Sequence, residues 1–305
     1  MEPFKIHILG CGSALPTLHH NASSQVVEVR QKLFMVDCGE GTQMQLRRSH
    51  IRFLNIRCVF VSHRHGDRCF GLVGMLSTFG MLGRTMPLHI YAPTDMEPLL
   101  ALEKQLFLQG LTYEVVFHGV DTKTQKVVYE DRSLTVETLP LHHRVPCCGY
   151  LFREKPTLPH IRRDMIDYLN IPFSQINNIK NGADWTTEDG KTISNNRLVL
   201  TADAPRSYAY CSDTCYLPKL HERIKGVNLL YHESTYASDY PERAKKFFHS
   251  TSQQAAQVAR DAGAGQLLLG HYSARYDNEQ QLLEEARQIF PNSFLTDEGA
   301  VFDVK

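Results

Sequence analysis

The chain has 305 residues, of which 42% are hydrophobic and 22% charged, a balance typical of a folded protein with a substantial core. Its 33 lysine and arginine residues match its 33 aspartate and glutamate residues. This balance excludes binding of nucleic acid by overall positive charge, although not by a local basic patch. No apolar run approaches the roughly 18 residues of a membrane span, so we expect no membrane segment and, because the first residues already favour a strand, no signal peptide.

The eight cysteines do not follow the spacing of a disulfide framework or of a CxxC metal motif. Cys147 and Cys148 are adjacent, which is a poor geometry for a bridge between them. Free thiols in a chain of this length are typical of a reducing compartment, so we expect a cytoplasmic protein.

In chain order, the first half alternates short β-branched runs with turns, which predicts strands interrupted by helices. The expected strands are 4–9, 25–29, 33–36, 58–62, 88–91, 113–117, 133–139 and 150–152. The expected helices are 72–82 and 95–106, the second with Thr94 as its candidate N-cap. The run 58–62 is continuously apolar, as expected for a strand that is buried on both faces.

Between residues 153 and 200 the composition changes, with several prolines, the pair Arg162-Arg163 and the single tryptophan, Trp185. We interpret this stretch as an inserted arm of one domain that spans residues 1–305. After it we expect strands at 207–211, 229–233 and 266–270, helices at 252–262 and 278–289, and a last pair of strands. Strands followed by helices in both halves predict two α/β layers packed sheet against sheet.

The strongest local signal is the His63-x-His65-x-Asp67 motif, which directly follows the buried strand 58–62. Ligands of α/β folds usually collect at such strand ends, and imidazole with carboxylate suits a catalytic zinc ion. The alternative is a polar loop with incidental histidines. Further candidate ligands follow other predicted strands, as a binuclear site would require: His143, Asp213, His232-Glu233 and His271.

Together these motifs resemble the metallo-β-lactamase-fold hydrolases, and within them the ribonuclease Z family. The similar segments are GCGSALP at 10–16, FMVDCGEGTQ at 34–43, HRHGD at 63–67, FGLVG at 70–74, SDT at 212–214, HEST at 232–235, HST at 249–251 and GHYSARY at 270–276. The HEST, HST and GHYSARY segments distinguish this family from lactamases better than the histidine motif alone.

The resemblance implies a four-layer αββα sandwich and a zinc-dependent endoribonuclease that removes the 3′ trailer of precursor tRNA and leaves a 3′-OH. It implies two Zn²⁺ sites and a homodimer whose arm (153–200) holds RNA. The first metal would take His63, His65, His143 and a bridging Asp213; the second would take Asp67, Asp213 and His271.

This chain departs from the family pattern at three places. Arg68 replaces the usual histidine of HxHxDH, and because a guanidinium has no lone pair to offer, we expect a weakened second site. Cys69 is an alternative ligand there, although its side chain is expected to point into the core. The opening loop reads TLHHN at 17–21 without the usual basic residues, and the arm has IPFS at 171–174 instead of a glycine- and proline-rich hinge.

The resemblance also suggests catalytic roles. Asp67 would orient or deprotonate the attacking water, His249 would protonate the leaving oxygen, and Glu233 would orient His249; alternatively, His249 merely precedes a helix. Candidates for phosphate contacts are Arg275 and, in the arm, Arg162, Arg163 and Lys180. Alternatively, these side chains are simply exposed cations. The alternative functions are another phosphodiesterase or hydrolase on the same fold, or a metal-poor relative that binds RNA.

Overall fold

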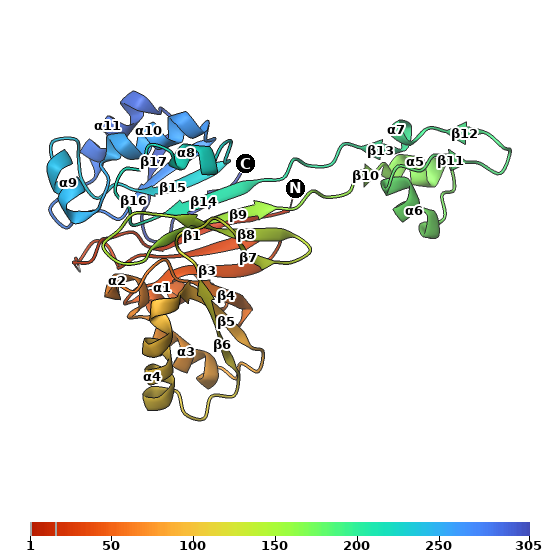
Figure 1. Cartoon of the computed structure of the whole chain (residues 1–305). Coiled ribbons are helices and arrows are strands. Elements are labelled where there is room, and N and C mark those ends of the chain that lie inside the picture. Colours follow the sequence, from red (N-terminus) through yellow and green to blue (C-terminus); the bar gives the residue numbers. More distant parts are fainter. Residues whose placement is uncertain (1, 16) are drawn as a thin grey trace. The chain divides into compact units, whose positions relative to one another are not determined.

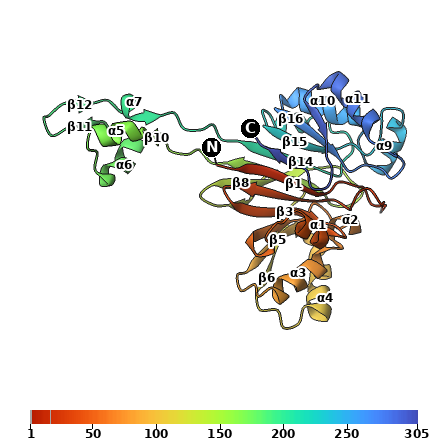
Figure 2. The same cartoon turned by 180° about the vertical axis from the view of Figure 1, so that it is seen from behind.

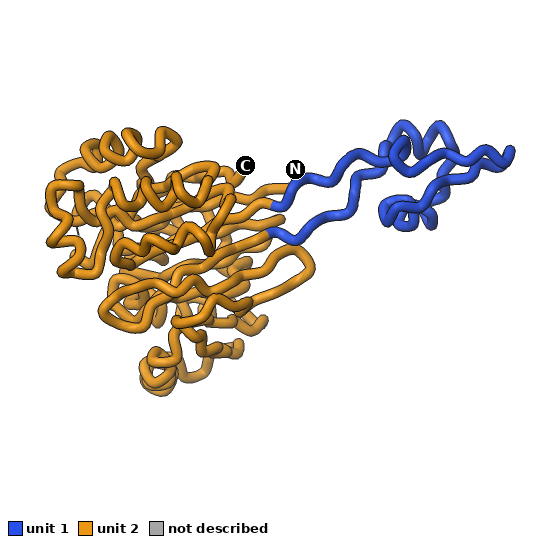
Figure 3. Tube along the Cα trace, turned by 45° about the horizontal axis from the view of Figure 1, so that its top comes forward, with its two compact units in different colours: residues 1, 154–205 blue, residues 2–153, 206–305 orange. Residues whose placement is uncertain are grey.

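The computed structural model describes residues 2–15 and 17–305; Pro16, the last residue of the GCGSALP segment, and Met1 lie outside this description. The described chain forms two compact units (Figure 3). Residues 154–205 form the smaller unit, called the arm below, and residues 2–153 with 206–305 form the larger one, the core unit. No described helix is long and apolar enough to cross a membrane.

The first sheet of the core unit contains seven strands in the order β18-β1-β2-β3-β4-β5-β6. Neighbouring strands are antiparallel from β18 to β3 and parallel from β3 to β6. Their bounds are β1 Phe4–Gly10, β2 Ser24–Val29, β3 Lys32–Cys38, β4 Ile56–Phe60, β5 Leu88–Pro93, β6 Val115–Val120 and β18 Val301–Asp303.

The second sheet also contains seven strands, in the order β17-β16-β15-β14-β9-β8-β7. The strands from β14 to β17 run parallel, so that their carboxyl ends meet at one edge. Their bounds are β7 Val127–Glu130, β8 Leu134–Pro140, β9 Cys148–Glu154, β14 Ser207–Cys211, β15 Leu229–Glu233, β16 Gln266–Gly270 and β17 Ser293–Leu295.

The two sheets pack face to face, and helices cover their outer faces (Figures 1 and 2). The helices of the first sheet are α1 Thr42–Arg48, α2 Gly66–Cys69, α3 Leu72–Met81 and α4 Glu97–Phe107, with the short 3-10 turns η1 Phe53–Asn55 and η2 Thr94–Met96. The helices of the second sheet are α8 Leu220–Arg223, α9 Pro241–Phe247, α10 Ser252–Ala262 and α11 Gln280–Ile289.

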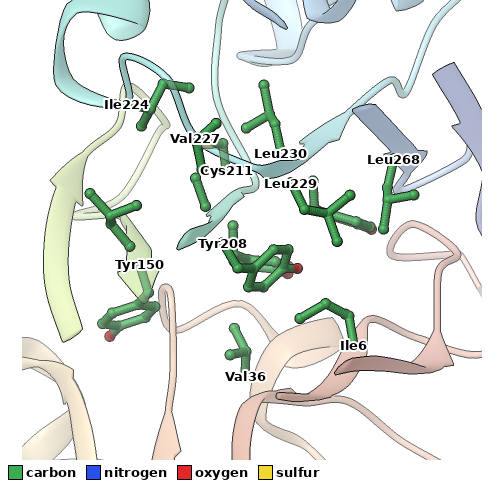
Figure 4. Close-up of a cluster of buried hydrophobic side chains, with 14 of the residues drawn as sticks. Ile6, Val36, Tyr150, Tyr208, Cys211, Ile224, Val227, Leu229, Leu230 and Leu268 are labelled. Carbon is green, nitrogen blue, oxygen red and sulfur yellow. The ribbon is translucent and has the colours of Figure 1, made fainter. Parts of the chain in front are cut away.

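Alternating strand residues fill the space between the sheets. Figure 4 shows Ile6 and Val36 of the first sheet with Tyr150, Tyr208 and Leu268 of the second, all buried in one hydrophobic cluster. A separate cluster lies between the first sheet and its helices, for example Val59 with Leu76 and Phe79. Burial of apolar surface is the main force that holds such layers together. The two packed sheets with helices on their outer faces confirm the expected four-layer αββα fold.

The arm has a small hydrophobic cluster of its own, made of Ile171, Ile179, Ile193 and Leu198. Its elements are β10 His160–Ile161, α5 Arg163–Tyr168, α6 Phe173–Lys180, β11 Trp185–Thr186, β12 Thr192–Ile193, α7 Asn195–Leu198 and β13 Val199–Leu200. The unit extends from residue 154 to residue 205, whereas the composition suggested 153–200.

Several predicted elements differ from the structure. Thr94 does not cap α4, because it opens a 3-10 turn and the helix begins only at Glu97, with Pro98 in its first turn. Tyr113 precedes β6, and its hydroxyl donates to the Leu76 carbonyl instead. The sequence did not reveal the short elements α1, α9 and β7. The last two strands are not a pair, since they extend opposite sheets.

Candidate metal centre

The predicted site residues all follow strands of the core unit. His63, His65 and Asp67 follow β4 of the first sheet, whereas His143, Asp213 and His271 follow β8, β14 and β16 of the second. Glu233 is the last residue of β15. The loops after these strands bring the side chains together at one edge of the two packed sheets.

Three imidazoles form the first half of the site, called the imidazole pole below. Nε2 of His63 lies 3.0 Å from Nδ1 of His65, and Nε2 of His143 lies 3.2 Å from the same atom. Oδ2 of Asp213 is 3.7 Å from His63 Nε2 and 4.0 Å from His143 Nε2. Donors around a tetrahedral zinc ion with bonds of about 2.0–2.1 Å are about 3.3 Å apart, so these four atoms fit one ion.

The second ring nitrogens of His63 and His143 are engaged elsewhere, which fixes the orientation of these two imidazoles. Nδ1 of His63 lies 3.0 Å from Ser62 Oγ, and Nδ1 of His143 lies 3.2 Å from the Phe248 carbonyl. Burial lowers the pKa of His63 well below its usual value and that of His143 to about 4. Both rings are therefore neutral near pH 7 and keep a lone pair for a metal.

The second half of the site, called the carboxylate pole below, contains Asp67, the other oxygen of Asp213, and His271. Nε2 of His271 lies 3.3 Å from Asp213 Oδ1 and 3.6 Å from Asp67 Oδ2. Among the described residues, neither His271 Nε2 nor Asp67 Oδ2 has a hydrogen-bond partner, although both atoms are buried. Because leaving such atoms unsatisfied is costly, their convergence favours a cation.

Arg68 already places a cation at this pole. Its guanidinium is fully buried and forms an ion pair with Asp213 Oδ1, while its Nε lies 3.4 Å from Asp67 Oδ2 and its Nη1 3.6 Å from Asp37 Oδ2. It also donates to Tyr210 and Ser212 at 3.2 and 3.1 Å. The imidazole pole therefore fits a metal ion well, whereas at the carboxylate pole a second ion would have to share both carboxylates with Arg68.

Cys69 does not supply the missing ligand. Its buried Sγ lies 3.4 Å from the His65 carbonyl and 3.9 Å from the Arg64 carbonyl. Burial raises the pKa of its thiol to about 12, so the thiol stays protonated. It points toward backbone carbonyl oxygens and not toward the ligand atoms of the carboxylate pole.

Glu233 orients two imidazoles at once. Its Oε1 lies 2.9 Å from His249 Nδ1, and its Oε2 accepts from the Thr235 hydroxyl, which is itself 2.8 Å from His271 Nδ1. Burial alone would lower the pKa of His249, but the Glu233 carboxylate outweighs it and raises that pKa to about 9. The ring of His249 also stacks on that of His271, with centroids 5.1 Å apart.

Asp37 is part of the site although sequence reasoning gave it no role. Its carboxylate accepts from the Ser62 backbone at 2.7 Å, from the Ser62 hydroxyl at 3.0 Å and from Tyr210 at 2.7 Å. Through Ser62 it supports His63, and through an ion pair it holds Arg68. Its backbone is left-handed, with φ of 57°, and the only signal in the sequence is its place in the DCGEGTQ segment.

The structure separates the other candidates. His232 is buried, its Nδ1 lies 2.8 Å from the Glu233 carbonyl, and it belongs to neither pole. The guanidinium of Arg275 lies over the rings of Tyr236 and Tyr240, 5.1 and 4.8 Å from their centroids, and Tyr236 in turn contacts His249. Arg162 and Arg163 belong to the arm, where Arg162 forms an ion pair with Asp164 at 2.6 Å.

Two mixed sheets lie between layers of helices, a histidine-rich loop follows a buried strand, and Asp213 lies within 4.0 Å of histidines of both poles. This combination defines the metallo-β-lactamase-fold class. Solved structures agree. Over 99% of both chains the fold matches human tRNase Z, short form, with a TM-score of 0.71 and 22% identity. It also matches the metallo-β-lactamase-fold protein YhfI from Bacillus subtilis, with a TM-score of 0.70 and 19% identity over 99% of this chain and all of the other. At these identities the likeness concerns the fold.

Sequence comparison narrows the class. The chain is 55% identical to ribonuclease Z of Phocaeicola vulgatus, over 98% of this chain and 96% of that protein. It is 46% identical to ribonuclease Z of Porphyromonas gingivalis over the full length of both. The chain therefore belongs to the ribonuclease Z family, as its motifs predicted. Residues 4–156 also match the model of a family described as anti-Pycsar protein Apyc1.

Proposed function

We propose that this protein is a zinc-dependent endoribonuclease that removes the 3′ trailer from precursor tRNA and leaves a 3′-OH on the tRNA. The observation that carries this proposal is the imidazole pole, in which three imidazoles cluster and Asp213 lies within 4.0 Å of two of them, together with the paired His249 and Glu233. Family membership supports the substrate class, because relatives over the full length of the chain are named ribonuclease Z.

The residues present fit one metal ion at the imidazole pole. A zinc ion held there would supply Lewis acidity, withdrawing charge from the phosphoryl group and activating water as the nucleophile. The protein itself would contribute three further side chains to catalysis: Asp67, His249 and Glu233. Among the described residues no donor makes a hydrogen bond to the buried Oδ2 of Asp67, so this oxygen can accept a hydrogen bond from the attacking water and orient it in line with the phosphorus.

His249 is placed to act on the leaving group. Glu233 accepts from its Nδ1, which leaves Nε2 as the nitrogen that can donate a proton to the 3′-oxygen as the P–O bond breaks. Thr214 and Thr235 satisfy the remaining hydrogen-bonding positions of Glu233. The carboxylate is thus fixed, and it holds the imidazole in one tautomer and one orientation, as in other acid–base pairs.

Binding of RNA would use cations that belong to neither pole. Arg275, held over two tyrosine rings, presents a planar fork that suits a phosphate. In the arm, Arg163 is exposed and Arg162 is partly neutralised by Asp164. We propose that the arm binds the tRNA backbone and that the enzyme is a homodimer, as the family resemblance implies; the eight free cysteines support a cytoplasmic, reducing location.

One experiment tests the proposal against its alternatives. Purified protein is incubated with a 3′-extended tRNA and, separately, with bis(p-nitrophenyl) phosphate, with and without a chelator. We expect chelator-sensitive cleavage of both, and a tRNA product with a 3′-OH. Cleavage of the small diester alone would indicate another phosphodiesterase on this fold, and binding of tRNA without any cleavage would indicate an RNA-binding relative.

A further inference from the structure

A third group of metal-ligating side chains lies outside the two poles of the active site. Cys11 at the end of β1, His20 of the opening loop and Glu298 before β18 converge, and are called the opening-loop cluster below. Sγ of Cys11 lies 3.3 Å from His20 Nδ1 and 3.8 Å from Glu298 Oε2, and His20 Nδ1 lies 2.9 Å from Glu298 Oε2. With Zn–S near 2.3 Å and Zn–N or Zn–O near 2.0–2.2 Å, donors around zinc are about 3.3–3.6 Å apart.

The remaining polar atoms of these side chains are already engaged, so that one atom of each faces the common point. Oε1 of Glu298 accepts from the backbone of Asn21 at 2.7 Å and of Cys11 at 3.3 Å. Nε2 of His20 lies 3.3 Å from Glu279 Oε1. A carboxylate on the second nitrogen of a histidine is the usual support of a metal-ligating imidazole, because it fixes the tautomer and makes the ligating nitrogen more basic.

We propose that Cys11, His20 and Glu298 bind a zinc ion separate from the active site. A thiolate with an imidazole and a carboxylate suits zinc better than the hard cations Mg²⁺ or Ca²⁺, which prefer oxygen ligands. A cavity of about 340 Å³, lined by His20, Glu279 and Asp297 among others, lies on the His20 side of the cluster.

Charge and protons balance as follows. Without a cation, burial raises the pKa of the Cys11 thiol to about 12, so the thiol is protonated. Binding of Zn²⁺ forms the S–Zn and N–Zn bonds and releases to solvent the thiol proton of Cys11 and the Nδ1 proton of a protonated His20, because coordinating thiols are deprotonated and ligating imidazoles are neutral. The thiolate and the Glu298 carboxylate then neutralise the ion. The metal-free alternative is a protonated His20 held between Glu279 and Glu298.

The cluster would have a structural role close to the catalytic loop. The Cys11 carbonyl accepts from the Tyr272 backbone at 3.0 Å, and Ser13 donates to the Tyr272 carbonyl at 3.0 Å. Tyr272 directly follows His271 of the carboxylate pole. An ion bound at the opening-loop cluster would therefore hold the opening loop and the His271 segment together.

Cobalt substitution tests this site directly, because the donors of the active-site poles are nitrogen and oxygen. Metal-free full-length protein is titrated with Co²⁺ and the thiolate-to-cobalt charge-transfer absorption is recorded. We expect the band in the wild-type protein and in His63→Ala, which lacks the imidazole pole. We expect its loss in Cys11→Ser and its retention in Cys215→Ser, a matched control at a thiol that is only partly buried.

Elemental analysis provides the second readout, with one zinc fewer per chain in Cys11→Ser than in the wild-type protein. Should Cys11→Ser fail to fold, His20→Asn gives the same test with the thiol intact. Absence of the band from the wild-type protein, or its persistence in Cys11→Ser, would overturn the proposal; where Cys11→Ser does not fold, persistence of the band in His20→Asn would do so. That result would leave the opening-loop cluster as an ion-paired histidine, with no bearing on the active-site metal.

Discussion

The two poles of the active site share Asp213 but differ in how their charge is compensated. The imidazole pole contains three clustered imidazoles, and Asp213 Oδ2 lies 3.7 Å from His63 Nε2 and 4.0 Å from His143 Nε2. The carboxylate pole contains Asp67, the second oxygen of Asp213 and His271, and Arg68 supplies a cation from within the chain. The imidazole pole therefore offers its nitrogen lone pairs to a cation from solution, whereas at the carboxylate pole a cation is built into the fold.

This difference shows how one substitution can alter a metal centre without dismantling it. A buried carboxylate loses its hydration and needs a cationic partner to offset that cost. Either a metal ion or a guanidinium can be that partner. Arg68 forms ion pairs with Asp213, Asp67 and Asp37 together, although Asp67 Oδ2 has no hydrogen-bond partner among the described residues. The carboxylates can thus keep their positions around the imidazole pole even when only one metal ion is bound.

The largest effect is expected from removing the imidazole pole. His63→Ala deletes one of the three imidazoles of this pole, so metal content and activity on both tRNA and a small diester should fall to background. Elemental analysis and initial rates measure this. The matched control is His142→Ala, an exposed histidine next to His143; if it lowered metal content equally, the assignment of the imidazole pole would be wrong.

Substitution of Arg68 tests the carboxylate pole. Arg68→His restores a possible ligand and removes the internal cation, so bound zinc should rise by about one ion per chain. Arg68→Met leaves three buried carboxylates without their cation and should lower the free energy of unfolding by about 3–5 kcal/mol, measured by denaturant unfolding. Two tightly bound zinc ions at the wild-type active site would refute unequal occupancy of the poles.

A smaller effect is expected at His249, which lies between the poles but is not counted as a ligand. His249→Ala should leave metal content unchanged and lower the rate on tRNA by about 10²–10⁴, the usual contribution of a positioned acid. The effect should shrink for bis(p-nitrophenyl) phosphate, because its leaving group needs no proton. Loss of metal, or an equal loss on both substrates, would exclude the general-acid role.

The pH profile sharpens the role of Glu233. Its carboxylate raises the pKa of His249 to about 9, so the acid is protonated below that pH and activity should fall as the pH rises through it. Glu233→Gln removes the negative charge, and the alkaline limb of kcat/KM should move to lower pH. An unchanged limb would mean that a different group titrates there.

The smallest effect is expected in the arm, far in sequence from either pole. Arg163→Ala should raise KM for tRNA a few-fold and reduce the salt dependence of binding by about one unit of slope. Hydrolysis of the small diester should not change, because only uniform binding is lost. Arg162→Ala should have less effect, since Asp164 already neutralises this cation. Equal losses on both substrates would assign the arm a structural role.

Much of the architecture was predictable because it is written in local patterns. The helix α10 begins and ends where its pattern predicts, with Thr251 and Gln254 forming a capping box at its start. The strand before His63 is a continuous apolar run and is indeed buried. Short elements such as α1 and β7 were missed, because their few residues carry too little periodicity; β7 is an edge strand with mixed exposure.

What the sequence by itself determined is the kind of residue at each strand end, and hence the family, the fold and the candidate ligands. Only the tertiary structure decided how those side chains pair. Arg68 meets Asp37 and Asp213 because β3, β4 and β14 end at the same edge of two packed sheets. Glu298 meets Cys11 because β18 lies beside β1. Partners 31 to 287 positions apart are set by strand order and register, which local spacing along the chain does not encode.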